Sequence, residues 1–221
     1  MPELPEVETT LRGLAPHLRS RSILKVVVRN SRLRWPVVPD LSQRLQGASF
    51  QKIHRRAKYL LFETDRGIIM LHLGMSGSLR VVPADFPARA HDHVDILLDD
   101  GFCLRYHDPR RFGSIHLLKE LKHPLLDSLG PEPLGETFHG QYLYLLSRKR
   151  RVSVKQFIMD GRIVVGVGNI YANEALFMAG IHPARGAGRI SLGRFEVLSE
   201  SIKLVLSGAI KQGGTTIRDF V

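Results

Sequence analysis

The chain has 221 residues and is 43% hydrophobic, and its 32 Lys and Arg against 21 Asp and Glu give a formal net charge of +11 and an isoelectric point near 10.2. Such an excess favours a polyanionic partner, either nucleic acid or an anionic membrane surface. The sequence has no apolar run near the roughly 18 residues that a membrane span needs and no signal-peptide pattern. Its one cysteine excludes an internal disulfide and a cysteine-rich zinc site within these residues. We therefore expect a cytosolic protein that binds nucleic acid.

A short helix opens the chain. Pro5 suits the first turn of a helix, and Glu6 and Glu8 complement the positive end of the helix dipole. Apolar side chains at helical spacing form one stripe, at Val7, Leu11, Leu14 and Leu18. Eight β-type runs separated by turn residues follow, at 22–29, 49–55, 58–63, 67–72, 78–82, 93–98, 102–106 and 112–118. One helix before eight short strands predicts a β-sandwich.

A Pro- and Gly-rich stretch, residues 130–135, is the candidate domain boundary. Beyond it the pattern is helical, with helices expected near 137–147, 152–159, 169–179 and 191–211. The sequence therefore predicts an α+β protein. We expect a β-sandwich domain with a leading helix over residues 1–130 and a helical domain over residues 131–221.

The first residues suggest covalent chemistry. Removal of Met1 leaves Pro2 with a free secondary amine, which can attack the anomeric carbon of a sugar. The iminium that forms stays cationic, so the neighbouring carbon becomes acidic and the 3′ phosphate can leave by elimination. Glu3 follows at once and could donate or relay protons. The alternative interpretation is that Pro2 and Glu3 merely lead into a helix N-terminus.

Five segments stand out in order along the chain: Met1–Glu8, His54–Leu61, Leu71–Gly77, Asp108–Gly113 and Gly166–Glu174. Each alone could arise by chance, but together they resemble the formamidopyrimidine-DNA glycosylase family over essentially all 221 residues. The resemblance implies a base-excision repair enzyme that removes oxidised purines (8-oxoguanine and formamidopyrimidines) and then cleaves the abasic strand by β,δ-elimination. Its implied partner is double-stranded DNA, and its helical domain carries a helix-two-turn-helix motif. Nothing in the sequence indicates more than a monomer.

The resemblance assigns the chemistry to Pro2, Glu3, Glu6 and Lys58. In this assignment Pro2 forms the Schiff base. A cation such as Lys58 disfavours the protonated form of a nearby amine, which keeps that amine nucleophilic. By resemblance, Lys58 also serves as an acid in the elimination step. The alternative is a solvated lysine at the start of a strand.

Two loops match the family segments that probe the duplex. A glycosylase must turn its target nucleotide out of the stack, which leaves a hole beside an orphaned partner base. By resemblance, Met75 fills the hole, Phe112 wedges the base step and Arg110 donates to the base-pairing edge of the orphan. The alternatives are that Met75 and Phe112 are core residues and that Arg110 binds a phosphate.

Further DNA contacts are expected on both domains. Gly168 permits a tight turn, and Asn169 can cap the helix that follows, which makes that helix N-terminus a phosphate site. The basic run that includes Arg150 and Arg151 is either a phosphate contact or a solvated helix end. The expected DNA-binding residues are His91, Arg110, Arg111, Arg150, Arg151, Gly168 and Asn169. His91 and His93 alternate like metal ligands, but no third ligand is evident, so we expect no metal in this chain.

The family ordinarily continues beyond the segment that ends at Val221. A loop that covers the flipped base follows, and then a four-cysteine zinc finger, so one structural zinc is implied for a full-length protein. We expect residues 1–221 alone to be a truncated form with weak activity or none.

Two alternative functions remain. One is an endonuclease VIII-type glycosylase for oxidised pyrimidines, which is disfavoured by Leu4 and by the set of Met75, Arg110 and Phe112. The other is a non-catalytic module that binds damaged DNA.

Overall fold

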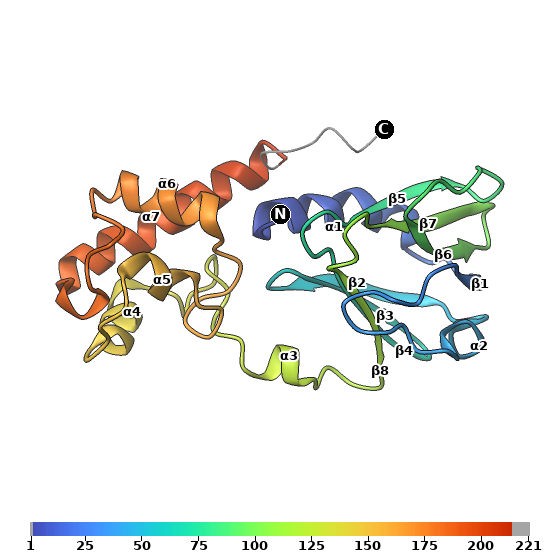
Figure 1. Ribbon diagram of the computed structural model, residues 1–221, viewed down its shortest axis with the longest axis horizontal. Coiled ribbons are helices and arrows are strands. Elements are labelled where there is room, and N and C mark those ends of the chain that lie inside the picture. The colour runs from blue at the N-terminus through green and yellow to red at the C-terminus, as the bar shows by residue number, and fades with distance from the viewer. Residues whose placement is uncertain (1, 214–221) are drawn as a thin grey trace. The chain divides into compact units, whose positions relative to one another are not determined.

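The computed structural model describes residues 2–213, which form two compact units (Figure 1). Of the described residues, the first unit contains Pro2 and residues 6–123, and the second contains residues 3–5 and 124–213. Across residues 2–213, no helix combines the length and the apolar character that crossing a bilayer requires.

The first unit is a sandwich of two four-stranded antiparallel sheets. One sheet has the order β1 (Ile23–Val28), β6 (Asp92–Leu98), β7 (Phe102–His107), β5 (Ser78–Pro83). The other has the order β2 (Phe50–Arg56), β3 (Tyr59–Thr64), β4 (Gly67–His72), β8 (Ser114–Leu118). The unit also contains most of helix α1 (Leu4–Leu18) and the short helix α2 (Leu41–Leu45).

Apolar side chains from both sheets and from α1 form the core of the sandwich. Val7, Leu14 and Leu18 of α1 are buried in it, and Leu11 packs against it, so the predicted stripe is confirmed. Cys103 is fully buried, as expected of a small interior residue. Pro16 lies inside the last turn of α1, and the helix continues to Leu18.

The strand order places two loops side by side at one end of the sandwich. The loop Leu73–Gly77 runs from β4 to β5, and the loop Asp108–Gly113 runs from β7 to β8, so both cross from one sheet to the other. In the first sheet β5 pairs with β7, and in the second β4 pairs with β8. The strands that precede and follow the two loops are therefore hydrogen-bonded to one another in both sheets. This pairing places the two loops next to each other.

The second unit is helical. Its elements are α3 (Pro124–Asp127), α4 (Gly140–Ser147), α5 (Val154–Met159), α6 (Asn169–Met178), the 3-10 turn η1 (Ala187–Arg189) and α7 (Leu192–Lys211). Ser153 and Gln156 form a reciprocal capping box that sets the start of α5. A second apolar core lies among these helices, with Phe138, Phe157 and Phe195 buried in it.

The α+β architecture, the eight strands and the four longer helices of the second unit agree with the prediction from the sequence. The sequence does not predict α2 and α3. These helices have five and four residues, which is too short for a 3.6-residue period to show.

Candidate functional site

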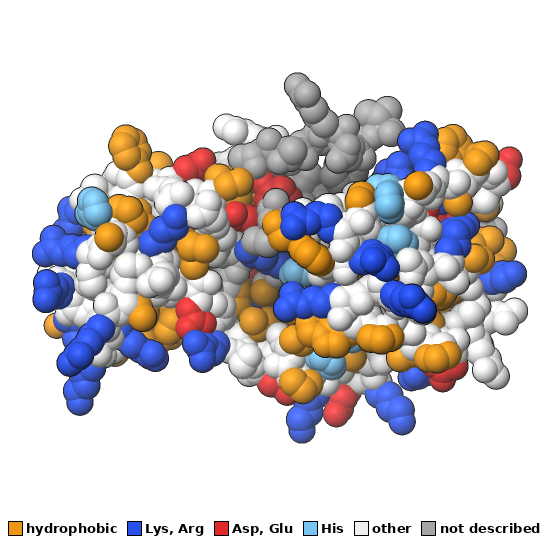
Figure 2. Space-filling model, viewed as in Figure 1, with side chains coloured by type: hydrophobic (Ala, Val, Ile, Leu, Met, Phe, Trp, Pro, Cys, Tyr) orange, Lys and Arg blue, Asp and Glu red, His pale blue; other side chains and the backbone are white. Residues whose placement is uncertain are grey.

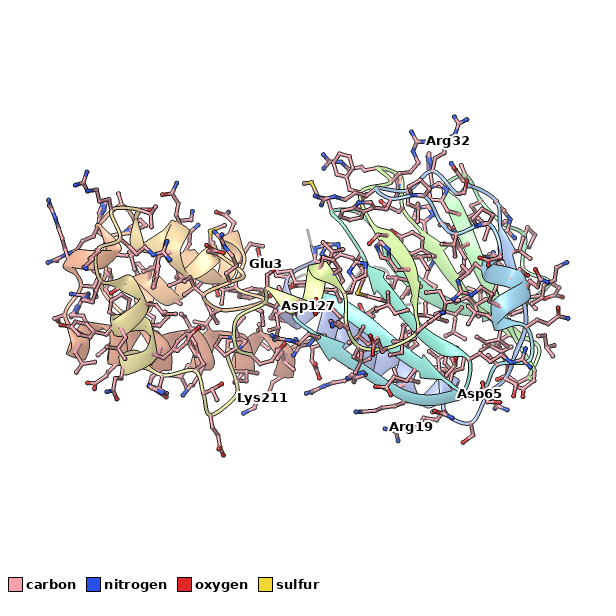
Figure 3. All side chains as sticks on the ribbon, turned by 90° about the horizontal axis from the view of Figure 1, so that it is seen from below. Glu3, Arg19, Arg32, Asp65, Asp127 and Lys211 are labelled. Atoms are coloured by element: carbon pink, nitrogen blue, oxygen red, sulfur yellow. The ribbon has the colours of Figure 1, made fainter. Side chains whose placement is uncertain are left out.

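The N-terminal segment is anchored within the second unit by Glu3, which is labelled in Figure 3. The Glu3 carboxyl is buried, and its Oε1 accepts a hydrogen bond of 3.1 Å from the backbone N–H of Ile170. The N–H of Leu4 donates to the carbonyl oxygen of Gly166 at 3.3 Å. Since Pro2 is covalently joined to Glu3, these contacts restrict where the amine of Pro2 can lie.

Two glycines allow this close approach. A Cβ added to Gly168 would lie 2.2 Å from Cδ of Glu3, and one added to Gly166 would lie 2.4 Å from Cδ1 of Leu4. Gly166 also has φ +79°, in the left-handed region that favours glycine. The GVGN turn is therefore shaped by the N-terminal segment that packs on it.

The prediction that Asn169 caps helix α6 is wrong. Gly168 is the N-cap residue, and it offers no side chain, while Asn169 is the first residue of the helix. A donor at this helix N-terminus is satisfied instead by the Glu3 carboxyl, which also complements the positive end of the helix dipole. The Asn169 side chain is exposed and stays a predicted DNA contact.

Lys58 lies, half-buried, in the turn between β2 and β3 rather than in a strand. An ion pair joins this turn to α1: Arg55 donates to Glu8 at 3.0 Å and to the carbonyl oxygen of Ala57 at 2.8 Å. Burial alone would raise the pKa of Glu8, but the hydrogen bonds from Arg55 and Arg12 hold it below its ordinary value. Glu8 therefore stays charged near neutral pH and fixes the turn that carries Lys58.

Glu6, the fourth expected catalytic residue, lies in the first turn of α1 and is partly buried. Its carbonyl oxygen accepts a hydrogen bond of 2.8 Å from the Thr10 hydroxyl. Glu6 and Lys58 both belong to the first unit, whereas Glu3 belongs to the second. The role of each in catalysis stays a prediction.

The expected wedge residues are exposed on the two neighbouring loops. Met75 is 41% and Phe112 is 44% exposed, so the interpretation of these two side chains as core residues is wrong. The Arg110 guanidinium lies 4.7 Å from the ring centroid of Phe112. The three line a cavity of about 730 Å³ together with Arg32, Leu33, Arg34, His72, Gly74 and Arg111.

His72 also lies at this site, although it is not among the functional residues predicted from the sequence. Its Nδ1 accepts a hydrogen bond of 3.0 Å from the N–H of Gly74, and its ring lies 4.9 Å from that of Tyr59. Burial and the charges of Lys58 and Arg34 lower the pKa of His72 to about 4. The ring is therefore neutral at physiological pH, as an acceptor at Nδ1 must be. The sequence does give one indication of its role, because His72 directly precedes the loop Leu73–Gly77 that carries the expected wedge residue Met75.

The remaining expected DNA contacts lie on separate elements. His91 and Arg111 are exposed and adopt positive φ of 71° and 56° in the first unit. Arg150 and Arg151 are exposed in the second unit, between α4 and α5. On the face drawn in Figure 2, basic side chains lie on both units.

Within residues 2–213, no cluster of three or more His, Cys, Asp or Glu side chains could hold a metal ion.

The pH dependence of stability tests the state of His72. An unfolded histidine takes up its proton near pH 6.5, whereas His72 in the fold does so near pH 4, so the unfolded chain binds more protons between these values. Stability should therefore fall as the pH falls through this window, by about 3 kcal/mol from this residue. In His72→Asn, the side-chain Oδ1 takes the place of Nδ1 and does not titrate. The fall in stability that is due to His72 should therefore be absent in this variant.

The measurement is the free energy of unfolding in urea at pH 7 and pH 4.5 for both proteins. Other groups titrate in both and cancel in the difference. Equal losses in the two proteins would show that His72 titrates in the fold as it does in the unfolded chain.

Comparison with known proteins gives one family for the whole chain. The formamidopyrimidine-DNA glycosylase N-terminal domain matches residues 1–115, and the H2TH domain of the same family matches residues 129–221. The chain is 58% identical over 223 residues to a formamidopyrimidine-DNA glycosylase of Thioalkalivibrio sulfidiphilus and 59% identical over 221 residues to one of Alcanivorax borkumensis. In both cases the match covers all of this chain and 82% of the relative.

Solved structures agree with this result. The wild-type Lactococcus lactis Fpg in complex with DNA that contains N7-benzyl-Fapy-dG superposes with a TM-score of 0.92 at 33% identity. The Lactococcus lactis Fpg in complex with abasic DNA gives the same TM-score and identity, and each match covers 99% of this chain and 82% of the other. The chain belongs to the formamidopyrimidine-DNA glycosylase family.

Proposed function

We propose that this protein removes oxidised purines, such as 8-oxoguanine and formamidopyrimidines, from double-stranded DNA and then cleaves the abasic strand through a Schiff base on Pro2. The observation that carries the proposal is the buried Glu3 carboxyl, which holds the residue next to Pro2 against Gly168 and Ile170. A solved relative in complex with DNA that contains N7-benzyl-Fapy-dG supports the purine class, and one in complex with abasic DNA supports the second step.

The chemistry follows from a secondary amine. The Pro2 nitrogen forms a bond to C1′ of the damaged nucleotide, the bond from C1′ to the base breaks, and the base leaves with a proton. The bound amine then loses its proton, O4′ accepts a proton, and the C1′–O4′ bond breaks. The open-chain sugar that results is an iminium, which stays cationic because its nitrogen carries no proton to lose. Loss of a C2′ proton expels the 3′ phosphate, and a second elimination expels the 5′ phosphate.

Proton transfers in these steps need acids and bases close to the sugar. We assign them to Glu3, beside the nucleophile in the chain, and to Lys58, in the turn that the Glu8–Arg55 ion pair fixes. Glu6 is assigned to the same machinery from the first turn of α1. These steps use only the terminal amine and side chains of the chain.

Recognition of the lesion requires that the nucleotide leave the stack. In this proposal Met75 enters the vacated space, Phe112 enters the neighbouring base step, and Arg110 donates to the orphaned base. The stacking of Arg110 on Phe112 supports a joint role, since it keeps the guanidinium beside the wedge. His91, Arg111, Arg150, Arg151, Gly168 and Asn169 are proposed to contact the DNA backbone. We propose that the protein acts as a monomer and that it works in the bacterial cytosol, where the chromosome lies.

Borohydride trapping tests the nucleophile. With Met1 removed, the protein joined to the C-terminal segment that the family ordinarily carries should form a covalent adduct with duplex DNA that contains 8-oxoguanine or an abasic site, and peptide mapping should place the adduct on Pro2. A preparation that retains Met1, checked by intact mass, is the matched control, because its proline nitrogen is an amide and cannot form an imine. An adduct on Lys58, or equal trapping by the control, would overturn the assignment.

Replacement of the expected orphan-base donor tests the wedge. Arg110→Ala should weaken capture of a lesion in duplex DNA by roughly tenfold or more, since a good base contact contributes about 1–3 kcal/mol. Cleavage of a preformed abasic site in single-stranded DNA should change little, because no orphaned base exists there. Arg44→Ala, which removes a half-exposed arginine from α2, controls for loss of charge. Equal losses on duplex and single strand would make Arg110 an ordinary phosphate contact.

A further inference from the structure

Asp108 lies at the start of the loop Asp108–Gly113 and is completely buried. Its carboxylate accepts three hydrogen bonds. The Ser76 hydroxyl donates to Oδ1 at 2.7 Å, and the Tyr106 hydroxyl and the N–H of Gly113 each donate to Oδ2 at 2.9 Å. One carboxylate therefore binds the end of β7, the end of its own loop and the neighbouring loop Leu73–Gly77.

Ser76 is the link between the two loops. Its hydroxyl donates to Asp108 and accepts from the backbone N–H of Arg110 at 3.3 Å. Ser76 directly follows Met75 in the chain, and Arg110 precedes Phe112 by two residues. The hydroxyl thus connects the backbone that carries one wedge residue to the backbone that carries the other two.

The two loops also touch through their backbones. A Cβ added to Gly74, which has φ +65°, would lie 2.5 Å from the backbone N of Gly113. A Cβ added to Gly113 would lie 1.9 Å from the hydroxyl oxygen of Tyr106 and 2.5 Å from the carbonyl oxygen of His72. The loops therefore pack without intervening side chains, and a shift of one displaces the other.

A buried carboxylate makes this connection stiff. A charged acceptor that loses a donor in a dry environment suffers a larger penalty than an exposed one, so the three hydrogen bonds favour one joint arrangement. The burial of the Tyr106 ring raises the pKa of its hydroxyl, which therefore stays a donor at every working pH.

We propose that Asp108, acting through Ser76, is a positioning residue that makes the two loops one rigid unit, so that Met75, Arg110 and Phe112 enter the duplex together. This inference rests on the proposed function of these three side chains as the wedge. Neither Asp108 nor Ser76 needs to touch the reacting atoms.

The test measures insertion without chemistry. A duplex carries a tetrahydrofuran abasic analogue with 2-aminopurine beside it, and the fluorescence of 2-aminopurine rises when a wedge unstacks it. Ser76→Ala should reduce the rise at saturating protein by roughly tenfold or more, the effect of losing one hydrogen bond to a charged acceptor. Ser76→Thr keeps the hydroxyl and should restore most of the signal.

Ser114→Ala is the matched control. Ser114 is buried close to the same loops, and its hydroxyl oxygen has no hydrogen-bond partner among residues 2–213, so its removal should leave the fluorescence unchanged. The salt dependence of binding should also stay the same in Ser76→Ala, since no phosphate contact is removed, whereas loss of a phosphate contact would lower the slope by about one.

An unchanged fluorescence rise in Ser76→Ala would overturn the inference. So would a loss that Ser76→Thr does not restore, or an equal loss in Ser114→Ala, because each points to general disturbance of the fold. Failure of the proposed function would appear separately, as absence of a trapped adduct on Pro2 in the wild-type protein.

Discussion

The carboxyl group of Glu3 lies against Gly168 and accepts a hydrogen bond from the N–H of Ile170, 167 residues further along the chain. A terminal segment is ordinarily mobile unless something holds it, and a nucleophile on such a segment would sample many positions. Here a buried carboxyl occupies the N-terminus of α6, where the unsatisfied N–H groups and the helix dipole both favour negative charge. The catalysis that we propose for the amine of Pro2 depends on this anchor, because proximity is effective only when the geometry is held.

Elsewhere in the site, too, an acidic side chain that is held by hydrogen bonds fixes a backbone segment that carries a proposed functional side chain. Glu8 holds the turn that carries Lys58 through Arg55, and Asp108 holds the loops that carry Met75 and Arg110. The Asp108 side chain is fully buried and that of Glu8 is 17% exposed, whereas Met75 is 41% exposed. The fold therefore separates residues that maintain geometry from residues proposed to touch DNA.

The sequence predicts local structure well because short β-type runs are separated by turn residues and because helix α1 has one periodic apolar face. It also predicts which loops carry exposed apolar residues, since Gly74 and Gly113 mark turns. It fails where a contact depends on distant residues. Asn169 looks like a cap, but Glu3 supplies that acceptor from the other end of the chain, and no local pattern indicates it. The low pKa of His72 likewise depends on burial and on two cations that only the fold brings near.

A direct test of the anchor uses Gly168→Ala, because an added Cβ would lie 2.2 Å from the Glu3 carboxyl carbon and must displace it. The measurement is the single-turnover rate of borohydride-trapped adduct formation on saturating abasic duplex, with affinity for a tetrahydrofuran duplex measured in parallel. Gly208→Ala, where a Cβ meets open space, is the control. We expect the rate at saturating DNA to be lower by on the order of 100-fold in Gly168→Ala, as for a displacement of about 1 Å, whereas any loss of affinity would report the proposed backbone contact of Gly168. A trapping rate equal to that of the wild type would contradict our account.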